Sequence, residues 1–189
     1  MPAVLFVCTA NRIRSPLAAA LFQRRLAAGE DAATWRVASA GTWADDGLPA
    51  MAAAQQVAAE AGLDLSRHRS RRVEELDLAD FDLILTMTTG QAEALRVEMP
   101  GHAARILPLT QAALGLAYDV DDPVGRPWPS TGARWTSWTT SWRGGWRRSW
   151  RGLKRMQRLR PRSRPRLNDR GLTVLPGGVT RARWDARDR

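Results

Sequence analysis

The stretch Val4-Leu5-Phe6-Val7-Cys8-Thr9-Ala10-Asn11-Arg12-Ile13-Arg14-Ser15-Pro16 decides how this chain folds. Its first four residues are apolar, which is the composition of a short buried β-strand. Pro16 opens a stretch with helical apolar spacing that extends to Leu26, and proline is typical of the first helical position. We therefore predict a strand, a tight loop and the start of a helix in direct succession.

The loop begins at Cys8, the single cysteine of the chain, and ends at Arg14 and Ser15. Backbone N–H groups of a short loop before a helix converge on one point, and the helix dipole adds positive charge there, so the loop suits an anion. This field favours the thiolate form of Cys8. Arg14 can hold two phosphate oxygens, and the Ser15 hydroxyl can donate a hydrogen bond to the thiolate. The arrangement favours nucleophilic attack on phosphorus; the alternative is a buried structural cysteine.

The length and composition set outer bounds on the protein. With 189 residues, one domain plus a tail is the natural expectation. One cysteine excludes internal disulfides and cysteine-rich metal sites. No apolar run is long enough to span a membrane, and no signal peptide precedes the first strand. We therefore expect a reducing, cytoplasmic setting, which a thiolate nucleophile needs.

Charge divides the chain into two parts. Residues 128–189 hold 17 Lys or Arg, 3 Asp and seven of the nine tryptophans, a net charge of +14. Residues 1–127 therefore carry −4 of the overall +10. We place a domain boundary after residue 127, with a Trp/Arg-rich tail from 128 to 189.

Residues 1–127 read as alternating strands and helices. This order predicts parallel strands with helices on both faces, a three-layer α/β/α sandwich around a four-stranded parallel sheet. A ligand then binds beyond the carboxyl ends of the strands, where Cys8 falls. We expect strands near residues 4–7, 35–39, 81–87 and 105–109, and helices near 17–28, 50–61, 73–78 and 90–98.

The first stretch resembles the phosphate loop of the low-molecular-weight protein tyrosine phosphatase family, which also includes thiol-dependent arsenate reductases. The usual loop of that family reads Cys-x-Gly-Asn-x-Cys-Arg-Ser. The resemblance implies a nucleophile and a phosphate-holding arginine in this loop, with supporting roles for its asparagine and serine. Four residues match the pattern, namely Cys8, Asn11, Arg14 and Ser15, and two depart from it, Ala10 for glycine and Ile13 for the second cysteine. The phosphate-binding residues would then be Thr9, Ala10, Asn11, Arg12, Ile13 and Arg14.

Three further positions follow from the resemblance. Asp122, before Pro123, matches the Asp-Pro loop whose aspartate is the general acid, while Asp119 and Asp121 are local competitors. A carboxyl group can protonate the leaving oxygen and then deprotonate the attacking water. Trp43 lies where the family has residues that wall the substrate cleft. Thr88 replaces an aspartate that is common there, which affects contacts near the site.

The tail from residue 128 to 189 has neither helical nor strand periodicity, so we expect it to be irregular or disordered. The family normally ends with an amphipathic helix after its Asp-Pro loop, and none is visible here. Tryptophan, arginine, serine, glycine and threonine are the residues that a GC-rich coding sequence for a helix yields when it is translated in a shifted reading frame. One choice of codons for residues 128–142 regroups into a string with helical apolar spacing. We interpret the tail as a frameshift product, which reading the gene would test.

We predict a metal-independent, cofactor-free phosphatase that hydrolyses phosphomonoesters, with protein phosphotyrosine as substrate, through a cysteinyl-phosphate intermediate. Cys8, Arg14 and Asp122 are its expected catalytic residues. One alternative is an arsenate reductase that uses an external thiol. Another is an inactive protein whose basic tail adheres non-specifically to nucleic acid. The expected partner is a phosphorylated protein or a small phosphomonoester that serves as substrate. We expect no association with a membrane, and we expect the protein to be a monomer.

Overall fold

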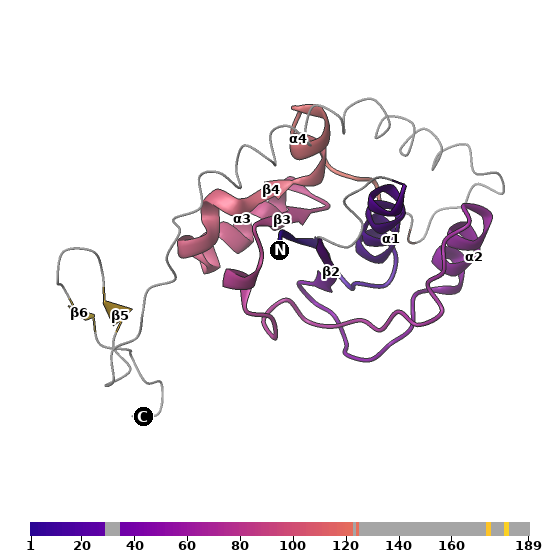
Figure 1. Cartoon of the computed structure of the whole chain (residues 1–189), viewed down its shortest axis with the longest axis horizontal. Helices are drawn as coiled ribbons and strands as arrows, with labels where there is room; N and C mark the ends of the chain where they lie inside the picture. The colour runs from indigo at the N-terminus through magenta and orange to yellow at the C-terminus, as the bar shows by residue number, and fades with distance from the viewer. Residues whose placement is uncertain (29–34, 123, 125–172, 175–179, 182–189) are drawn as a thin grey trace. The chain divides into compact units, whose positions relative to one another are not determined.

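The computed structural model describes residues 1–28, 35–122 and 124, and the backbone of 173–174 and 180–181 (Figure 1). The chain forms two compact units, Met1–Lys154 and Arg155–Arg189. Within the second unit, β5 (Thr173–Val174) and β6 (Thr180–Arg181) pair antiparallel. The expectations for the rest of the tail, and the boundary after residue 127, lie outside the described residues.

Four parallel strands form the sheet of the first unit, in the order β2-β1-β3-β4. The central strand β1 is buried at every residue, as its apolar composition requires. Val4 of β1 pairs with Val37 on one side and Leu83 on the other. The strands span Ala3–Cys8 (β1), Arg36–Gly41 (β2), Leu83–Thr86 (β3) and Ile106–Pro108 (β4). The predicted four-stranded parallel sheet is therefore confirmed.

Helices cover both faces of this sheet (Figure 1). Because side chains alternate along a strand, Val4, Phe6 and Cys8 face one side, where α1 and α4 pack. Leu5 and Val7 face the other side, where α3 packs. The helices span Arg14–Ala27 (α1), Ala52–Glu60 (α2), Thr89–Glu98 (α3) and Leu109–Leu114 (α4), with two 3-10 turns at Leu78–Asp80 and Pro100–Arg105. The predicted three-layer α/β/α sandwich is confirmed.

Two local predictions were wrong. Helix α1 begins at Arg14, so Pro16 is its third residue and not its first. This is tolerated because no N–H of the first turn has an intrahelical partner. The helix predicted over residues 73–78 is absent: Val73 donates its N–H to the carbonyl of Gly41, and its side chain is buried against the sheet. Tertiary pairing therefore overrides the local apolar spacing.

No helix in the described part of the chain combines the length and the apolar character needed to cross a bilayer.

Helix α2 ends where Gly62 adopts a φ of +68°, as predicted from its glycine. The carboxyl end of β1 opens directly into the loop 9–13 and then into α1, so Cys8 lies at the edge of the sheet where the strands end.

Candidate active site

The loop that follows β1 turns its carbonyl groups outward. The carbonyl of Cys8 accepts from the N–H of Thr42, that of Thr9 from Trp43, and that of Arg12 from Met51, at 2.9–3.0 Å. In a trans peptide the next N–H points opposite to the carbonyl, so the loop N–H groups point toward its interior. The loop therefore presents a ring of donors suited to a phosphoryl group.

Cys8 ends β1 where this loop begins, and the residue is 3% exposed. Its Sγ lies 3.0 Å from the Oγ of Ser15, in the first turn of α1. The Ser15 hydroxyl also accepts from Asn11 Nδ2 at 2.8 Å and lies 3.3 Å from the carbonyl of Ala40. A hydroxyl has one proton, so Ser15 donates it either to Ala40 or to Cys8. An ionised Cys8 attracts this proton, because a charged acceptor makes the stronger hydrogen bond.

Asn11 holds the middle of the loop in an uncommon conformation. Its φ is +54°, in the left-handed region, and its side chain is fully buried. The side chain donates to Ser39 Oγ at 3.0 Å and accepts from the N–H of Arg71 at 3.1 Å. His68 Nε2 donates to the Asn11 carbonyl at 2.6 Å. These contacts come from two separate segments, β2 and residues 68–71, so the loop conformation is fixed by the fold around it.

His68 is a residue whose role sequence reasoning missed. A carbonyl oxygen only accepts hydrogen bonds, so the proton on His68 must be on Nε2. Burial lowers the pKa of His68, the hydrogen bond to Asn11 opposes this, and the charges of Arg71 and Arg69 lower it further. The neutral ring therefore suffices to hold the loop. His68 stands 57 positions from Asn11, and no local pattern indicates the contact.

Arg14 contacts one of the three candidate acids, Asp122, at the other side of the loop. Its Nη2 lies 2.5 Å from Asp122 Oδ2, and its Nη1 donates to the Val120 carbonyl at 3.2 Å. Asp119 instead accepts from the N–H and hydroxyl of Thr89, hydrogen bonds that lower its pKa. Asp121 is exposed. Of the three, Asp122 is the one whose carboxylate lies at the arginine of the loop.

The other predicted loop residues lie at its rim or behind it. Thr9 and Ala10 are exposed, and Thr9 Oγ1 accepts from Arg14 Nη2 at 3.4 Å. Arg12 donates from Nε to the carbonyl of Pro49 at 3.0 Å. Ile13 is buried against Leu17 and α2, so its side chain anchors the loop in the core. These positions leave the backbone of the loop, rather than its apolar side chains, to bind an anion.

Gly41 and Trp43 shape the rim next to β2. A Cβ atom on Gly41 would lie 2.4 Å from the Thr9 carbonyl oxygen, so this position requires glycine. Sequence reasoning assigned Gly41 no role, because a close approach of two backbones is not visible in a single sequence. The side chain of Trp43 is 86% exposed, while its N–H is bonded to the loop.

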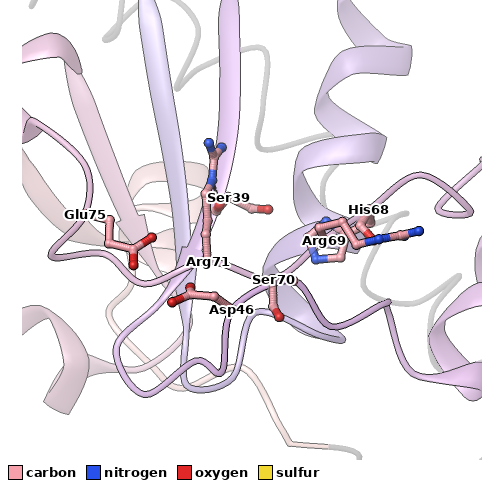
Figure 2. Close-up of a pocket in the computed structure, with 8 residues that line it drawn as sticks. Ser39, Asp46, His68, Arg69, Ser70, Arg71 and Glu75 are labelled. Atoms are coloured by element: carbon pink, nitrogen blue, oxygen red, sulfur yellow. Dashed lines mark hydrogen bonds between the residues drawn. The ribbon is translucent and has the colours of Figure 1, made fainter.

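A polar pocket of about 400 Å³ lies beside the segments that hold Asn11 (Figure 2). Figure 2 shows Asp46 and Glu75 toward one end and His68 with Arg69 toward the other. The hydrogen bond between Glu75 and Asp46 raises the pKa of Glu75. Among the described residues, no three His, Cys, Asp or Glu side chains are grouped so that they could hold a metal ion.

Comparisons with known proteins agree with this geometry. The family described as "Low molecular weight phosphotyrosine protein phosphatase" matches residues 3–128. A protein-arginine-phosphatase of Geobacillus stearothermophilus is 33% identical over 124 residues, 66% of this chain and 80% of the relative. The low molecular weight protein-tyrosine-phosphatase YfkJ of Bacillus subtilis is 37% identical over 131 residues, 65% and 81% of the two chains.

Solved structures show the same fold. The low molecular weight protein tyrosine phosphatase from T. tengcongensis has a TM-score of 0.61 at 33% identity, covering 84% of this chain and 99% of its own. A YwlE arginine phosphatase mutant with a phosphorylated active-site serine has a TM-score of 0.70 at 26% identity, covering 84% and 99%. The chain therefore belongs to the low molecular weight phosphotyrosine protein phosphatase family and is a phosphoric monoester hydrolase.

Proposed function

We propose that this chain hydrolyses protein phosphotyrosine through a cysteinyl-phosphate intermediate, with Cys8 as nucleophile, Arg14 as phosphate ligand and Asp122 as general acid. The observation that carries the proposal is the convergence of the three side chains on one loop. Cys8 Sγ lies 3.0 Å from Ser15 Oγ, and Arg14 Nη2 lies 2.5 Å from Asp122 Oδ2. A phosphorylated serine in the active site of the YwlE mutant supports a nucleophile at the site.

The reaction has two displacements at phosphorus. In the first, the Cys8 thiolate forms the S–P bond, the P–O bond to tyrosine breaks, and Asp122 gives its proton to the leaving phenolate. In the second, Asp122 takes a proton from water, the water oxygen bonds to phosphorus, and the S–P bond breaks to return the thiolate. Arg14 and the loop N–H groups balance the charge of the phosphoryl oxygens throughout.

The ion pair of Arg14 and Asp122 describes the protein before substrate binds. A phosphoryl dianion offers the guanidinium two oxygens, and a planar fork binds two oxygens better than one. The substrate then replaces Asp122 as the partner of Arg14, and the freed carboxylate takes up from solvent the proton that it gives to the leaving oxygen. Because 45% of the Asp122 side chain is exposed, the carboxyl group has room to turn toward the leaving oxygen.

Two rim residues support an aryl substrate. Trp43 exposes 86% of its surface next to the loop, and an indole can pack against a phenol ring. Arg12 is held at the loop by Pro49, and its positive charge opposes the guanidinium group of phosphoarginine. Relatives of this chain are named as both tyrosine and arginine phosphatases, and these two residues favour the first.

The test is hydrolysis of p-nitrophenyl phosphate in the presence of EDTA. We expect activity in the full chain, none in Cys8→Ser, and a loss of about 10²–10⁴-fold in Asp122→Ala. Full activity in Cys8→Ser would contradict the proposal. For the substrate, a phosphotyrosine peptide should be cleaved faster than its phosphoarginine counterpart, and Arg12→Gln should narrow the difference. A preference for phosphoarginine in the full chain would refute the substrate assignment.

A further inference from the structure

The N-terminal turn of α3 is bonded both to the phosphate loop and to the segment that carries Asp122. Within the turn, the Thr88 hydroxyl accepts from the N–H of Gln91, and Gln91 Oε1 accepts from the N–H groups of Met87 and Thr88. This capping box satisfies the helix end and fixes the Gln91 amide. Its Nε2 then donates to Thr9 Oγ1 at 3.0 Å, so the turn is attached to the phosphate loop.

The attachment to the acid segment is made by Asp119. Its Oδ1 accepts from both the N–H and the hydroxyl of Thr89, each at 2.8 Å. Thr89 is the first residue of α3, whose N–H has no partner within the helix. A carboxylate is favoured at this positive end of a helix, and here it comes from 30 positions away.

The residues on either side of Asp119 are also fixed. Val120 donates its N–H to the Met87 carbonyl at 2.8 Å and accepts from Arg14 at 3.2 Å. Tyr118 and Thr110 exchange two hydrogen bonds. The chain therefore arrives at Asp122 from a segment that is bonded at three consecutive residues. Of residues 118–120, Asp119 is the one whose side chain bonds to the start of α3. This side chain touches neither the Cys8 sulfur nor the phosphate loop.

We propose that Asp119 is a positioning residue for the general acid Asp122, acting through Thr89 at the start of α3. This rests on the proposed function, in which Asp122 protonates the leaving oxygen. The carboxylate holds the acid segment against the helix that also supports Thr9, so acid and nucleophile keep a fixed separation. Because Asp119 is exposed, its substitution removes this bond with little change to the core.

The experiment compares two substrates that differ in their need for an acid. Phenyl phosphate has a poor leaving group that needs protonation, and p-nitrophenyl phosphate has a good one that needs it less. We expect Asp119→Ala, which removes the acceptor oxygen, to lower kcat/KM for phenyl phosphate about tenfold and kcat/KM for p-nitrophenyl phosphate far less, because kcat/KM reports the step in which the leaving group departs. Thr89→Val should show the same pattern, and Thr89→Ser should restore turnover. Glu93→Gln, which removes an exposed charge from the same helix, is the matched control and should behave as the wild type.

A double-mutant cycle separates positioning from a general structural effect. In an Asp122→Ala background, Asp119→Ala should cause no further loss, because the group it positions is gone. The proposal would be overturned if the Asp119 variant lost kcat/KM equally on both substrates, or if it lost as much kcat/KM in the Asp122→Ala background as in the wild type. If the wild type hydrolyses neither substrate, the phosphatase function itself has failed. Amide hydrogen exchange then decides the positioning: Asp119→Ala must accelerate exchange at Val120 while Glu93→Gln does not, and unchanged exchange overturns it.

Discussion

Replacing Asn11 by alanine should damage both stability and catalysis. The side chain is fully buried and makes three hydrogen bonds, to Ser15, Ser39 and the N–H of Arg71. A net contribution of about 1 kcal/mol for each gives about 3 kcal/mol. Alanine at a φ of +54° adds about 1 kcal/mol more, since only Gly, Asn and Asp visit this region readily. The expected loss is thus about 4 kcal/mol, a large part of the 5–15 kcal/mol typical of a domain.

Urea denaturation measures this loss, and turnover of p-nitrophenyl phosphate measures its effect on the site. Asn11→Gly is the matched variant, because glycine also lacks the three hydrogen bonds but adopts the positive φ freely. It should lose about 3 kcal/mol, so the two variants differ by the conformational term alone. Both should turn over substrate at least about tenfold more slowly, because Ser15 is no longer held beneath Cys8.

Two outcomes would refute this reasoning. A change in stability below about 1 kcal/mol in Asn11→Ala would mean that the buried hydrogen bonds contribute nothing net. Wild-type turnover in a folded Asn11→Gly would mean that the loop reaches its active conformation without this residue.

Three other predictions concern residues around the loop. Ser15→Ala removes the hydroxyl 3.0 Å from Cys8, and a hydrogen bond to a charged group is worth about 1.5–3 kcal/mol, so turnover should fall about 10–100-fold; an unchanged kcat would contradict this. Gly41→Ala places a Cβ 2.4 Å from the Thr9 carbonyl, which should destabilise the fold by about 1–3 kcal/mol in urea, whereas Gly90→Ala, with open space around it, should not. Burial lowers the pKa of His68, so below pH 6.5 the unfolded chain binds more protons than the folded chain, and the free energy of unfolding should decrease as the pH is lowered. His68→Gln should lack this part of the decrease, and urea midpoints with the same pH dependence in both proteins would contradict the prediction.

The fold was predictable because its signals are local. The apolar run of β1 and the loop that ends at Ser15 lie within residues 3–15, and alternating strands and helices leave few arrangements. The start of α1 was less clear, since proline is compatible with several positions of a first helical turn and here occupies the third.

The support of the loop was not predictable, because it depends on contacts between distant segments. Ser39, His68 and Arg71 stand 28, 57 and 60 positions from Asn11. Gly41 is required by a backbone approach that no sequence pattern encodes. The helix expected at residues 73–78 failed for the same reason, since Val73 donates its N–H to the distant Gly41 carbonyl.

The most direct test of the proposed chemistry is to trap the intermediate. The full chain and Asp122→Ala are mixed with p-nitrophenyl phosphate, denatured rapidly and digested, and the peptide that contains Cys8 is analysed by mass spectrometry. The account predicts a phosphoryl group on this peptide, enriched in Asp122→Ala because the water that cleaves the S–P bond has lost its base. Phosphate release by an active enzyme with no phosphoryl group on Cys8 in either protein would contradict it.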